Sequence, residues 1–290
     1  MSDYHTSILA KEVLEFAPDS GIIIDATLGG GGHSEMIFKK LKSGKLISID
    51  RDKDAIDHVV NKYGLHAKGD HYSLVEGEKE WLVMKSDFDR VGNILNEFQI
   101  EKVDFILADL GVSSHQIDEK TRGFSFMEKG PLDMRMNQEQ QLTARDLVNG
   151  LNQKELVKIF KDYGEERYAD EIANAIVRAR STKEIKNTVD IVEIIRRTVG
   201  EKYESKNPAM RVFQALRIAV NDELGELERF LDQVAKKCIG STIFILTFHS
   251  LERNIVEKYV SENEKVYPTD QEVRANSRSK SCIGMKGMIA

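Results

Sequence analysis

The sequence predicts an α/β protein with a doubly wound, Rossmann-like sheet and an inserted all-helical domain. Within residues 1–112, short β-branched runs alternate with helical patterns, as expected for βαβ units. Three of these runs end in an aspartate. Residues 113–210 show only helical periodicity. We therefore expect a discontinuous sheet domain over 1–112 and 211–290, with 113–210 as the insert.

The first strand and the loop after it predict that the sheet domain binds a ligand. Ile22–Ile24 is a β-branched run that ends at Asp25 and leads into Gly29–Gly32. Glycines let the backbone turn tightly near a ligand, and the helix that follows presents N–H groups to it. A second run, Lys45–Ile49, ends in Asp50, where an acid can accept both hydroxyls of a ribose. The pattern predicts a nucleotide-like ligand.

The glycine loop fits one nucleotide-binding pattern better than the others. In a dinucleotide site Ser34 would take the third small position of G-x-G-x-x-G/A, so that fingerprint is imperfect. No G-x-x-x-x-G-K-[ST] run occurs, which argues against a P-loop hydrolase. From Asp25 to Gly31 the loop fits D-x-x-x-G-x-G, which resembles the first motif of class I S-adenosylmethionine-dependent methyltransferases.

The next segments continue the alternation of strands and helices. Gly64–Glu80 is polar, and we expect a surface excursion there. Trp81–Lys85 is expected to be a strand that brings Phe88 to its carboxyl end, where the ring can pack on an adenine or simply join the core. Val103–Ala108 is the following strand and ends in Asp109. Helical patterns occur at His5–Phe16, Asp54–Tyr63 and Val91–Phe98.

The insert opens with a loop of unusual composition. Between Arg122 and Met136, aromatic residues such as Phe124 and Phe126 alternate with small and charged ones. Aromatic rings beside arginine suit an unstacked base and its phosphates. A small local core under a long loop explains the same residues without a function. Helical patterns follow at Gln153–Tyr163, Arg167–Arg180 and Asn187–Val199.

The last part of the chain returns to the sheet. One long helix is expected from Pro208 to its end at Gly240, with Asn207 as its N-cap and apolar residues on one face as far as Val234. Thr242–Phe248 is then a strand, and Ser250 is the expected N-cap of the helix after it. Beyond Glu272 the charged residues are all basic. That tail can meet RNA phosphate or form a solvated, poorly ordered end.

The net charge and composition of the sequence limit the class of protein and the kinds of site that it can contain. A formal charge of −6 argues against non-specific coating of nucleic acid, although a local basic face remains compatible with RNA. Cys238 and Cys282 offer neither a disulfide framework nor a zinc pattern, and no histidine cluster has the spacing of metal ligands. No leader and no apolar run of membrane-spanning length is visible. We expect a cytoplasmic protein without a membrane partner.

Long blocks of this sequence, in the same order, resemble the MraW-type family of ribosomal small-subunit (16S) RNA cytosine-N4 methyltransferases. The resemblance extends from His5 to about Tyr259 and departs from the family at His115, where proline is usual, and in the tail at 276–285. The blocks that carry it are His5–Leu9, Gly31–Ser34, Ile49–Asp52, Asp109–Ser114, Arg122–Phe126, Gly130–Met136, Tyr163–Arg167, Phe213–Arg217 and Phe248–Glu252.

This resemblance implies a class I methyltransferase domain with an inserted helical substrate domain. The implied reaction moves a methyl group from S-adenosyl-L-methionine to the exocyclic amine of a cytidine in the decoding region of small-subunit ribosomal RNA, within the small ribosomal subunit. The implied cofactor residues are Gly31, Gly32, His33, Asp50, Phe88, Asp109 and Gln116. The expected substrate residues are Arg122, Phe124, Phe126, Asp133 and Arg135.

Asp109 is the candidate catalytic residue. A carboxylate that accepts a hydrogen bond from the cytosine amine would help its lone pair face the methyl group. The alternatives are methylation of another nucleic-acid base, or a non-catalytic ribosome-assembly factor that keeps the cofactor fold. Intact acids at positions 25, 50 and 109 favour an enzyme. The sequence leaves the oligomeric state open, a homodimer included.

Overall fold

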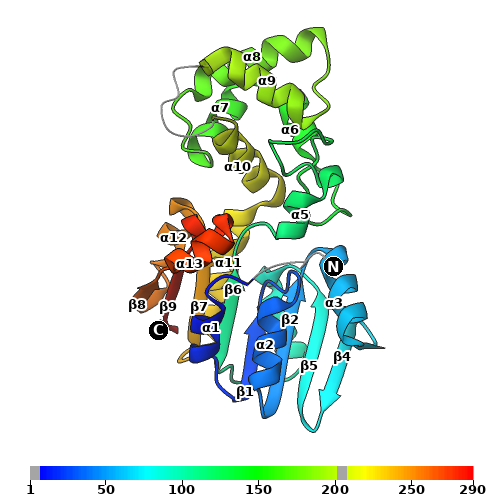
Figure 1. The fold of residues 1–290 in the computed structure, drawn as a ribbon, viewed down its shortest axis with the longest axis vertical. Coiled ribbons are helices and arrows are strands. Elements are labelled where there is room, and N and C mark those ends of the chain that lie inside the picture. Colours follow the sequence, from blue (N-terminus) through cyan, green and yellow to red (C-terminus); the bar gives the residue numbers. More distant parts are fainter. Residues whose placement is uncertain (1–6, 201–207, 290) are drawn as a thin grey trace. The chain divides into compact units, whose positions relative to one another are not determined.

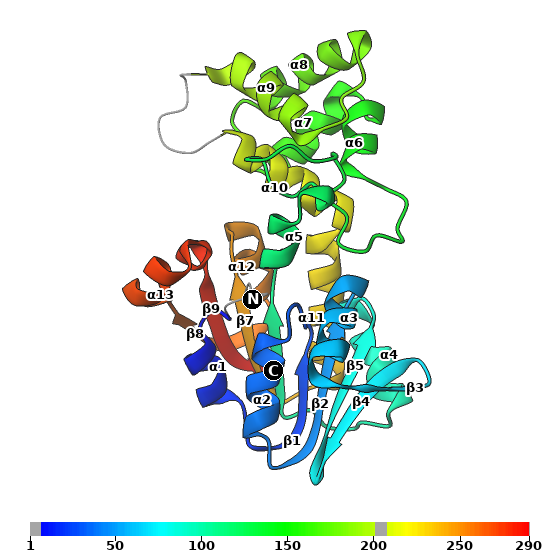
Figure 2. The same cartoon turned by 45° about the vertical axis from the view of Figure 1, so that its right-hand side comes forward.

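The computed structural model describes residues 7–200 and 208–289, and the chain divides into two compact units (Figures 1 and 2). The first unit combines residues 1–113 with 224–290, and the second spans 114–223. The sheet belongs to the first unit and the helical insert to the second.

The first unit is built on a nine-stranded sheet with the order β3-β4-β5-β2-β1-β6-β7-β9-β8. Its five central strands are parallel, and the chain reverses its direction of winding at β1, so the predicted doubly wound sheet is confirmed. Antiparallel strands flank them on each side. The parallel strands are β5 (Glu78–Lys85), β2 (Ser43–Asp50), β1 (Ser20–Asp25), β6 (Phe105–Asp109) and β7 (Thr242–Thr247).

Apolar side chains cover both faces of this sheet. Ile23 and Ile24 point to opposite faces, as successive strand residues do, and both are fully buried in separate cores. Burial on both faces explains why β1 is an unbroken apolar run. The helices that cover the Ile23 face are α1 (Ala10–Phe16), α2 (Gly32–Lys40) and α3 (Lys53–Tyr63). Those that cover the Ile24 face are α4 (Val91–Glu97), α11 (Glu223–Lys237) and α12 (Ser250–Val256).

The predicted surface excursion over Gly64–Glu80 is wrong. The segment forms β3 (His66–Lys68) and β4 (His71–Glu76), which continue the sheet at one edge: β4 pairs antiparallel with β5, and β3 pairs antiparallel with β4. Gly69 and Gly77 have φ of 69° and 61°, so they are the turns of two successive hairpins. An edge hairpin buries few side chains, which is why its polar sequence resembled a loop.

The basic tail is also ordered, so the alternative of a poorly ordered end is wrong for the described residues. It contains the end of α13 (Asp270–Ala275) and β9 (Ile283–Ile289), and β9 lies between β7 and β8 (Val260–Val266). Lys286 lies over the Phe16 ring, with Nζ 3.5 Å from its centroid. The basic residue at 286 therefore packs on the N-terminal helix of the same unit.

Two helix predictions need correction. The long helix expected from Pro208 to Gly240 is broken at Asp222, whose φ of 51° is left-handed and cannot continue a right-handed helix. The expected N-cap Ser250 is the first residue of α12, and His249 is the cap. Glu252 completes the cap because its side chain accepts a hydrogen bond from the His249 backbone N–H.

The second unit is helical, apart from one isolated bridge between Pro131 and Asn187 in its described residues. Its predicted boundary at 210 falls short, because α10 (Pro208–Asn221) packs against α7 and α9. Asn207, the predicted cap of α10, lies outside the described residues. The other helices are α5 (Ser114–Asp118), α6 (Ala144–Gly150), α7 (Gln153–Asp162), α8 (Ala169–Thr182) and α9 (Thr188–Val199). None of the helices in 7–200 or 208–289 is long and apolar enough to cross a membrane.

Candidate functional site

Three aspartates end three neighbouring strands of the first unit. Asp25 ends β1, and β2 and β6, which end in Asp50 and Asp109, pair with β1 on its two sides. The strands are parallel, so the three acids lie at the same edge of the sheet. The chain reverses its winding at β1, and this is the position where open α/β sheets bind ligands.

The glycine loop after β1 is fixed to the neighbouring strand. Leu28 N–H donates to the Ile49 carbonyl at 2.8 Å, and Gly29 N–H donates to Asp50 Oδ2 at 2.8 Å. Gly31 has a φ of 77°, and a Cβ there would lie 2.8 Å from Val59 Cγ2. Gly31 is therefore required both for the turn and for the close approach of α3 to the loop.

Asp50 is held by two backbone donors. Its Oδ2 accepts from Gly29 N–H, and its Oδ1 accepts from Asp52 N–H at 2.8 Å. Each carboxylate oxygen has a second lone pair, so both can still accept from a ligand. Burial raises the pKa of Asp50 to about 6, and the two N–H bonds oppose that shift. The carboxylate is thus oriented in advance for a pair of hydroxyl donors.

A buried hydrogen-bonded chain under the loop was not predicted. Trp81 Nε1 donates to Ser48 Oγ at 2.9 Å, Ser48 and Ser34 hydroxyls lie 2.7 Å apart, and Ser34 Oγ donates to Asp25 Oδ2 at 2.6 Å. Asp25 is 1% exposed, and burial raises its pKa while the Ser34 bond opposes the rise. These hydrogen bonds connect the first turn of α2 to β2 and β5. The only trace of them in the sequence is a pair of serines among apolar residues.

His33 faces Asp109, and the ring nitrogens of His33 have hydrogen-bonding capacity left over. His33 Nε2 is 3.7 Å from Asp109 Oδ2, which is too long for a hydrogen bond. His33 is buried, yet neither ring nitrogen has a hydrogen-bond partner among the described residues. The Asp109 backbone N–H donates to Thr27 Oγ1 at 2.6 Å, which fixes the strand end. Unpaired buried nitrogens beside a carboxylate fit a site that a polar ligand completes.

Phe88 lies on the turn after β5, in the short 3-10 helix η1 (Phe88–Arg90). Its ring is half-buried and meets Phe230 of α11 edge to face, with centroids 5.1 Å apart. Gln233 of α11 donates to the Asp89 carbonyl and accepts from Gly92 N–H. Helix α11 therefore holds in place the turn that carries Phe88, and packing on an adenine stays a prediction.

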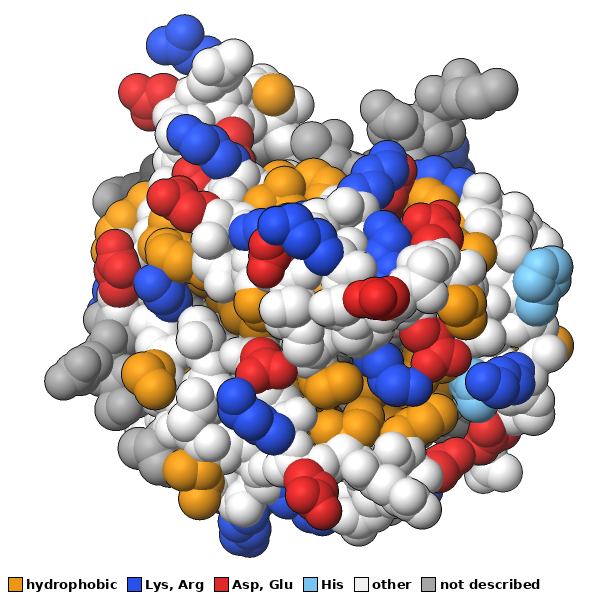
Figure 3. Space-filling model, turned by 90° about the horizontal axis from the view of Figure 1, so that it is seen from below, with side chains coloured by type: hydrophobic (Ala, Val, Ile, Leu, Met, Phe, Trp, Pro, Cys, Tyr) orange, Lys and Arg blue, Asp and Glu red, His pale blue; other side chains and the backbone are white. Residues whose placement is uncertain are grey.

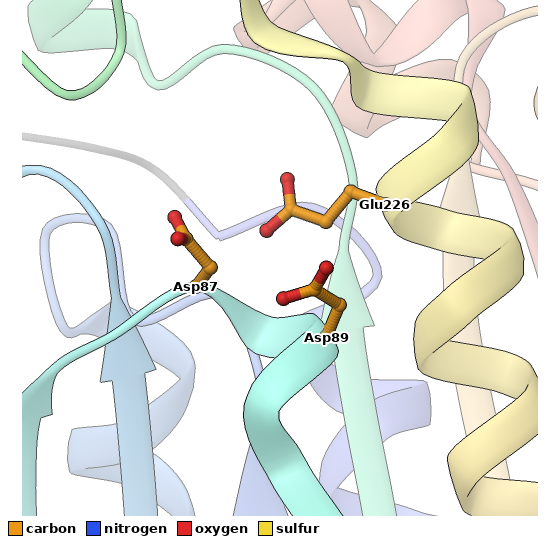
Figure 4. Close-up of side chains that lie close together, drawn as sticks. All are labelled: Asp87, Asp89 and Glu226. Atoms are coloured by element: carbon orange, nitrogen blue, oxygen red, sulfur yellow. The ribbon is translucent and has the colours of Figure 1, made fainter. Parts of the chain in front are cut away.

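An acidic cluster beside this turn was also missed by the sequence analysis. Asp87, Asp89 and Glu226 point toward one another (Figure 4). Arg51, which follows Asp50, lies between two of them, and Arg229 pairs with Asp89. Burial raises the pKa of Glu226 to about 8. The cluster joins distant parts of the chain, so no local motif could predict it.

In the second unit, the predicted substrate loop uses its arginines internally. Arg122 is buried and its Nη2 donates to the Arg135 and Met136 carbonyls at 3.0 and 2.9 Å. Arg135 forms a two-bond ion pair with Asp133 and donates to the Gln138 carbonyl at 3.0 Å. These contacts stabilise the loop itself, and any contact of Arg122, Asp133 or Arg135 with RNA stays a prediction.

The two phenylalanines of that loop differ in exposure. Phe124 is buried, whereas Phe126 is half-buried and meets Phe213 of α10 edge to face, with centroids 5.9 Å apart. Of the two, Phe126 is therefore the better placed to meet a base. Gln116 is buried on α5 in this unit, and its predicted part in cofactor binding remains a prediction.

Comparisons with known proteins agree over nearly the whole chain. The model of the MraW methylase family matches residues 2–287. A ribosomal RNA small subunit methyltransferase H from Ureaplasma urealyticum serovar 10 is 41% identical over 98% of this chain and 97% of its own. Proteins of the same name from Clostridium botulinum strain Kyoto and Halothermothrix orenii are 42% and 44% identical, over 90% and 89% of this chain and 82% and 81% of theirs.

Proposed function

The chain belongs to the MraW methylase family, and from that premise we propose that it methylates the exocyclic N4 amine of a cytidine in the decoding region of small-subunit ribosomal RNA. Its cofactor is S-adenosylmethionine. The observation that carries the proposal is the sheet edge of the first unit. There a glycine loop, an oriented Asp50 and the unpartnered ring nitrogens of His33, next to Asp109, come together.

The cofactor residues have separate tasks in this proposal. The backbone at Gly31 and Gly32, with His33, receives the polar end of the cofactor at the start of α2. Asp50 accepts hydrogen bonds from the two ribose hydroxyls with its remaining lone pairs. Phe88 packs on the adenine. Each task uses an atom or surface that the fold leaves available at this edge.

Asp109 orients the amine that receives the methyl group. The bound cofactor supplies a methyl group that its sulfonium already activates, so the protein must mainly align the acceptor and exclude water. The exocyclic amine of cytosine is a poor nucleophile because its lone pair is conjugated with the ring. A hydrogen bond from the amine to Asp109 turns that lone pair toward the methyl group. Asp109 suits this role because it ends β6 with its backbone fixed by Thr27.

The second unit is proposed to bind the RNA, within the small ribosomal subunit. The net charge of the whole chain is −6. The face drawn in Figure 3, seen from below the view of Figure 1, also offers no basic patch to RNA, because acidic and basic side chains of the described residues are interspersed there. Charge alone would therefore bind naked RNA weakly, so shape must contribute. Phe126 supplies a ring for the target base once it leaves its stack.

The direct test is mass spectrometry of nucleosides from small-subunit RNA. Small subunits isolated from cells that lack the protein are incubated with S-adenosylmethionine and the purified chain, and Asp109→Ala serves as the control. We expect N4-methylcytidine to form with the native chain only. Methylation of a different base, or an isolated hairpin modified as fast as intact subunits, would contradict the substrate assignment.

A further inference from the structure

A buried carboxylate oxygen without a partner lies beside two other carboxylates of the first unit. Glu226 on α11 is 1% exposed, and its Oε1 meets no hydrogen-bond donor among the described residues. Figure 4 shows its side chain directed toward Asp87 and Asp89. One oxygen of each residue lies within 4.8 Å of one oxygen of each of the others. Such an oxygen is costly to bury unless a positive charge or a donor faces it.

Two arginines balance only part of this acidic cluster. Arg51 Nη2 lies 2.8 Å from both Asp87 Oδ1 and Glu226 Oε2, and Arg229 Nε lies 2.7 Å from Asp89 Oδ2. Each carboxylate thus gives one oxygen to an arginine and keeps a second one. Three carboxylates against two guanidinium groups also leave one negative charge when all are ionised, a state that burial of Glu226 disfavours until a cation binds, because it raises the pKa of that residue to about 8. The unmatched oxygens and the unmatched charge call for the same kind of partner.

We propose that Asp87, Asp89 and Glu226 bind one hard divalent cation, of the class of Mg²⁺, Mn²⁺ or Ca²⁺. Carboxylate oxygens are the ligands that these ions prefer in proteins, and Mg²⁺ commonly keeps several waters, so three protein ligands suffice. A softer metal is disfavoured because the cluster contains neither histidine nor cysteine.

The ion has a structural consequence at the turn after β5. Asp87 and Asp89 flank Phe88 in η1, whereas Glu226 belongs to α11, so the ion joins the two elements. It acts together with the Phe88–Phe230 contact and the Gln233 hydrogen bonds. A fixed Phe88 also strengthens cofactor binding, a coupling that rests on the proposed function. Binding of the ion itself does not rest on it.

The test measures Mn²⁺ binding without cofactor. The full chain is treated with a chelator and desalted, and free Mn²⁺ is followed by electron paramagnetic resonance during a titration. We expect one bound Mn²⁺ per chain, competed by Mg²⁺ or Ca²⁺. Glu226→Gln and, as a less buried second variant, Asp87→Asn should each weaken binding about 10- to 100-fold. Glu228→Gln is the matched control, because Glu228 lies on the same helix but is exposed and outside the cluster.

Thermal unfolding separates loss of the ion from loss of the fold. Mn²⁺ should raise the melting temperature of the native chain and of Glu228→Gln, but not of Glu226→Gln, while melts in chelator show whether each variant folds. No Mn²⁺ binding at millimolar concentration, or binding unchanged in both cluster variants, overturns the proposal. If Glu226→Gln instead weakens S-adenosylhomocysteine binding in chelator and no Mn²⁺ binds, the free oxygens belong to the cofactor site and the cation proposal is wrong.

Discussion

Two regions with motif-like sequences use their polar groups in opposite ways. At the sheet edge, backbone donors fix Asp50, while the buried ring nitrogens of His33 meet no partner among the described residues. The two arginines of the loop from Arg122 to Met136 donate to carbonyls of the same segment, up to Gln138. Asn221 of α10 bonds the backbone of the loop at Met134 and Met136. These polar groups of the loop have partners within the second unit, whereas the buried nitrogens of His33 indicate a site that a ligand completes.

Substitutions in the two regions are expected to have different effects. Changes at the sheet edge should alter chemistry and cofactor affinity more than folding, although Asp50 also holds the backbone of the glycine loop. Changes at the buried residues of the loop should alter folding first. Phe126 is the residue of the loop that tests this division, because it is only half-buried.

The largest effect is expected for Asp109→Ala. Removal of the contact that orients the amine should slow methyl transfer by about 100-fold or more, because a small misplacement of the acceptor is costly. Single-turnover methylation of small subunits at saturating cofactor isolates this step, and circular dichroism melts check the fold. If the whole loss is recovered by raising the cofactor concentration, Asp109 acts in cofactor binding only.

The next effect is expected for Asp50→Ala. Loss of a charged acceptor for the ribose should weaken S-adenosylhomocysteine binding by about 1.5–3 kcal/mol, which is roughly 10- to 150-fold. Isothermal titration calorimetry measures this directly. Asp57→Ala is a suitable control, because Asp57 forms only a surface ion pair with Lys53 on α3. Equal affinities of the native chain and the Asp50 variant would remove Asp50 from the site.

Phe124 and Phe126 of the loop are expected to respond differently to replacement by alanine. Phe126→Ala should slow methylation about 5- to 150-fold if the ring stacks on the target base, with cofactor affinity unchanged. Phe124→Ala should instead lower the free energy of unfolding by about 3–5 kcal/mol, because that ring is buried. Urea unfolding and single-turnover transfer on both variants distinguish the roles. A loss of folding in both, without a selective defect in transfer, would make the whole loop a packing element.

Much of the first unit could be predicted because its strands follow simple rules. Continuous β-branched runs such as Ile22–Ile24 predict strands buried on both faces, and acids at their ends predict the ligand edge. The β3–β4 hairpin was missed because an edge strand is only partly buried and its residues resemble a loop. The break at Asp222 was missed because the apolar stripe continues across it, so periodicity gives no sign of the left-handed residue.

The parts of the site that escaped prediction depend on contacts between distant segments. The chain from Trp81 through Ser48 to Asp25 and the cluster around Glu226 each join residues from several elements. No spacing rule relates such residues before the fold brings them together. The internal use of Arg122 is hidden for the same reason, because a sequence shows the charge of an arginine but not the carbonyl to which it donates.

The smallest effect concerns pH and tests whether Asp50 binds the cofactor as a carboxylate. Burial raises its pKa to about 6, so protonation near that pH removes acceptor lone pairs that the ribose needs. Cofactor affinity should therefore be constant well above pH 6, about twofold lower at pH 6, and should fall further as the pH drops. Calorimetry with S-adenosylhomocysteine from pH 8 to pH 5.5 measures this.

The control is Asp50→Asn, whose side chain cannot ionise. Its cofactor affinity should be lower at every pH, and the fall in affinity near pH 6 should vanish. A native profile that matches that of the variant would show that the carboxylate does not discriminate between its protonation states when the cofactor binds. The proposed role of Asp50 as a charged acceptor at the sheet edge would then be wrong.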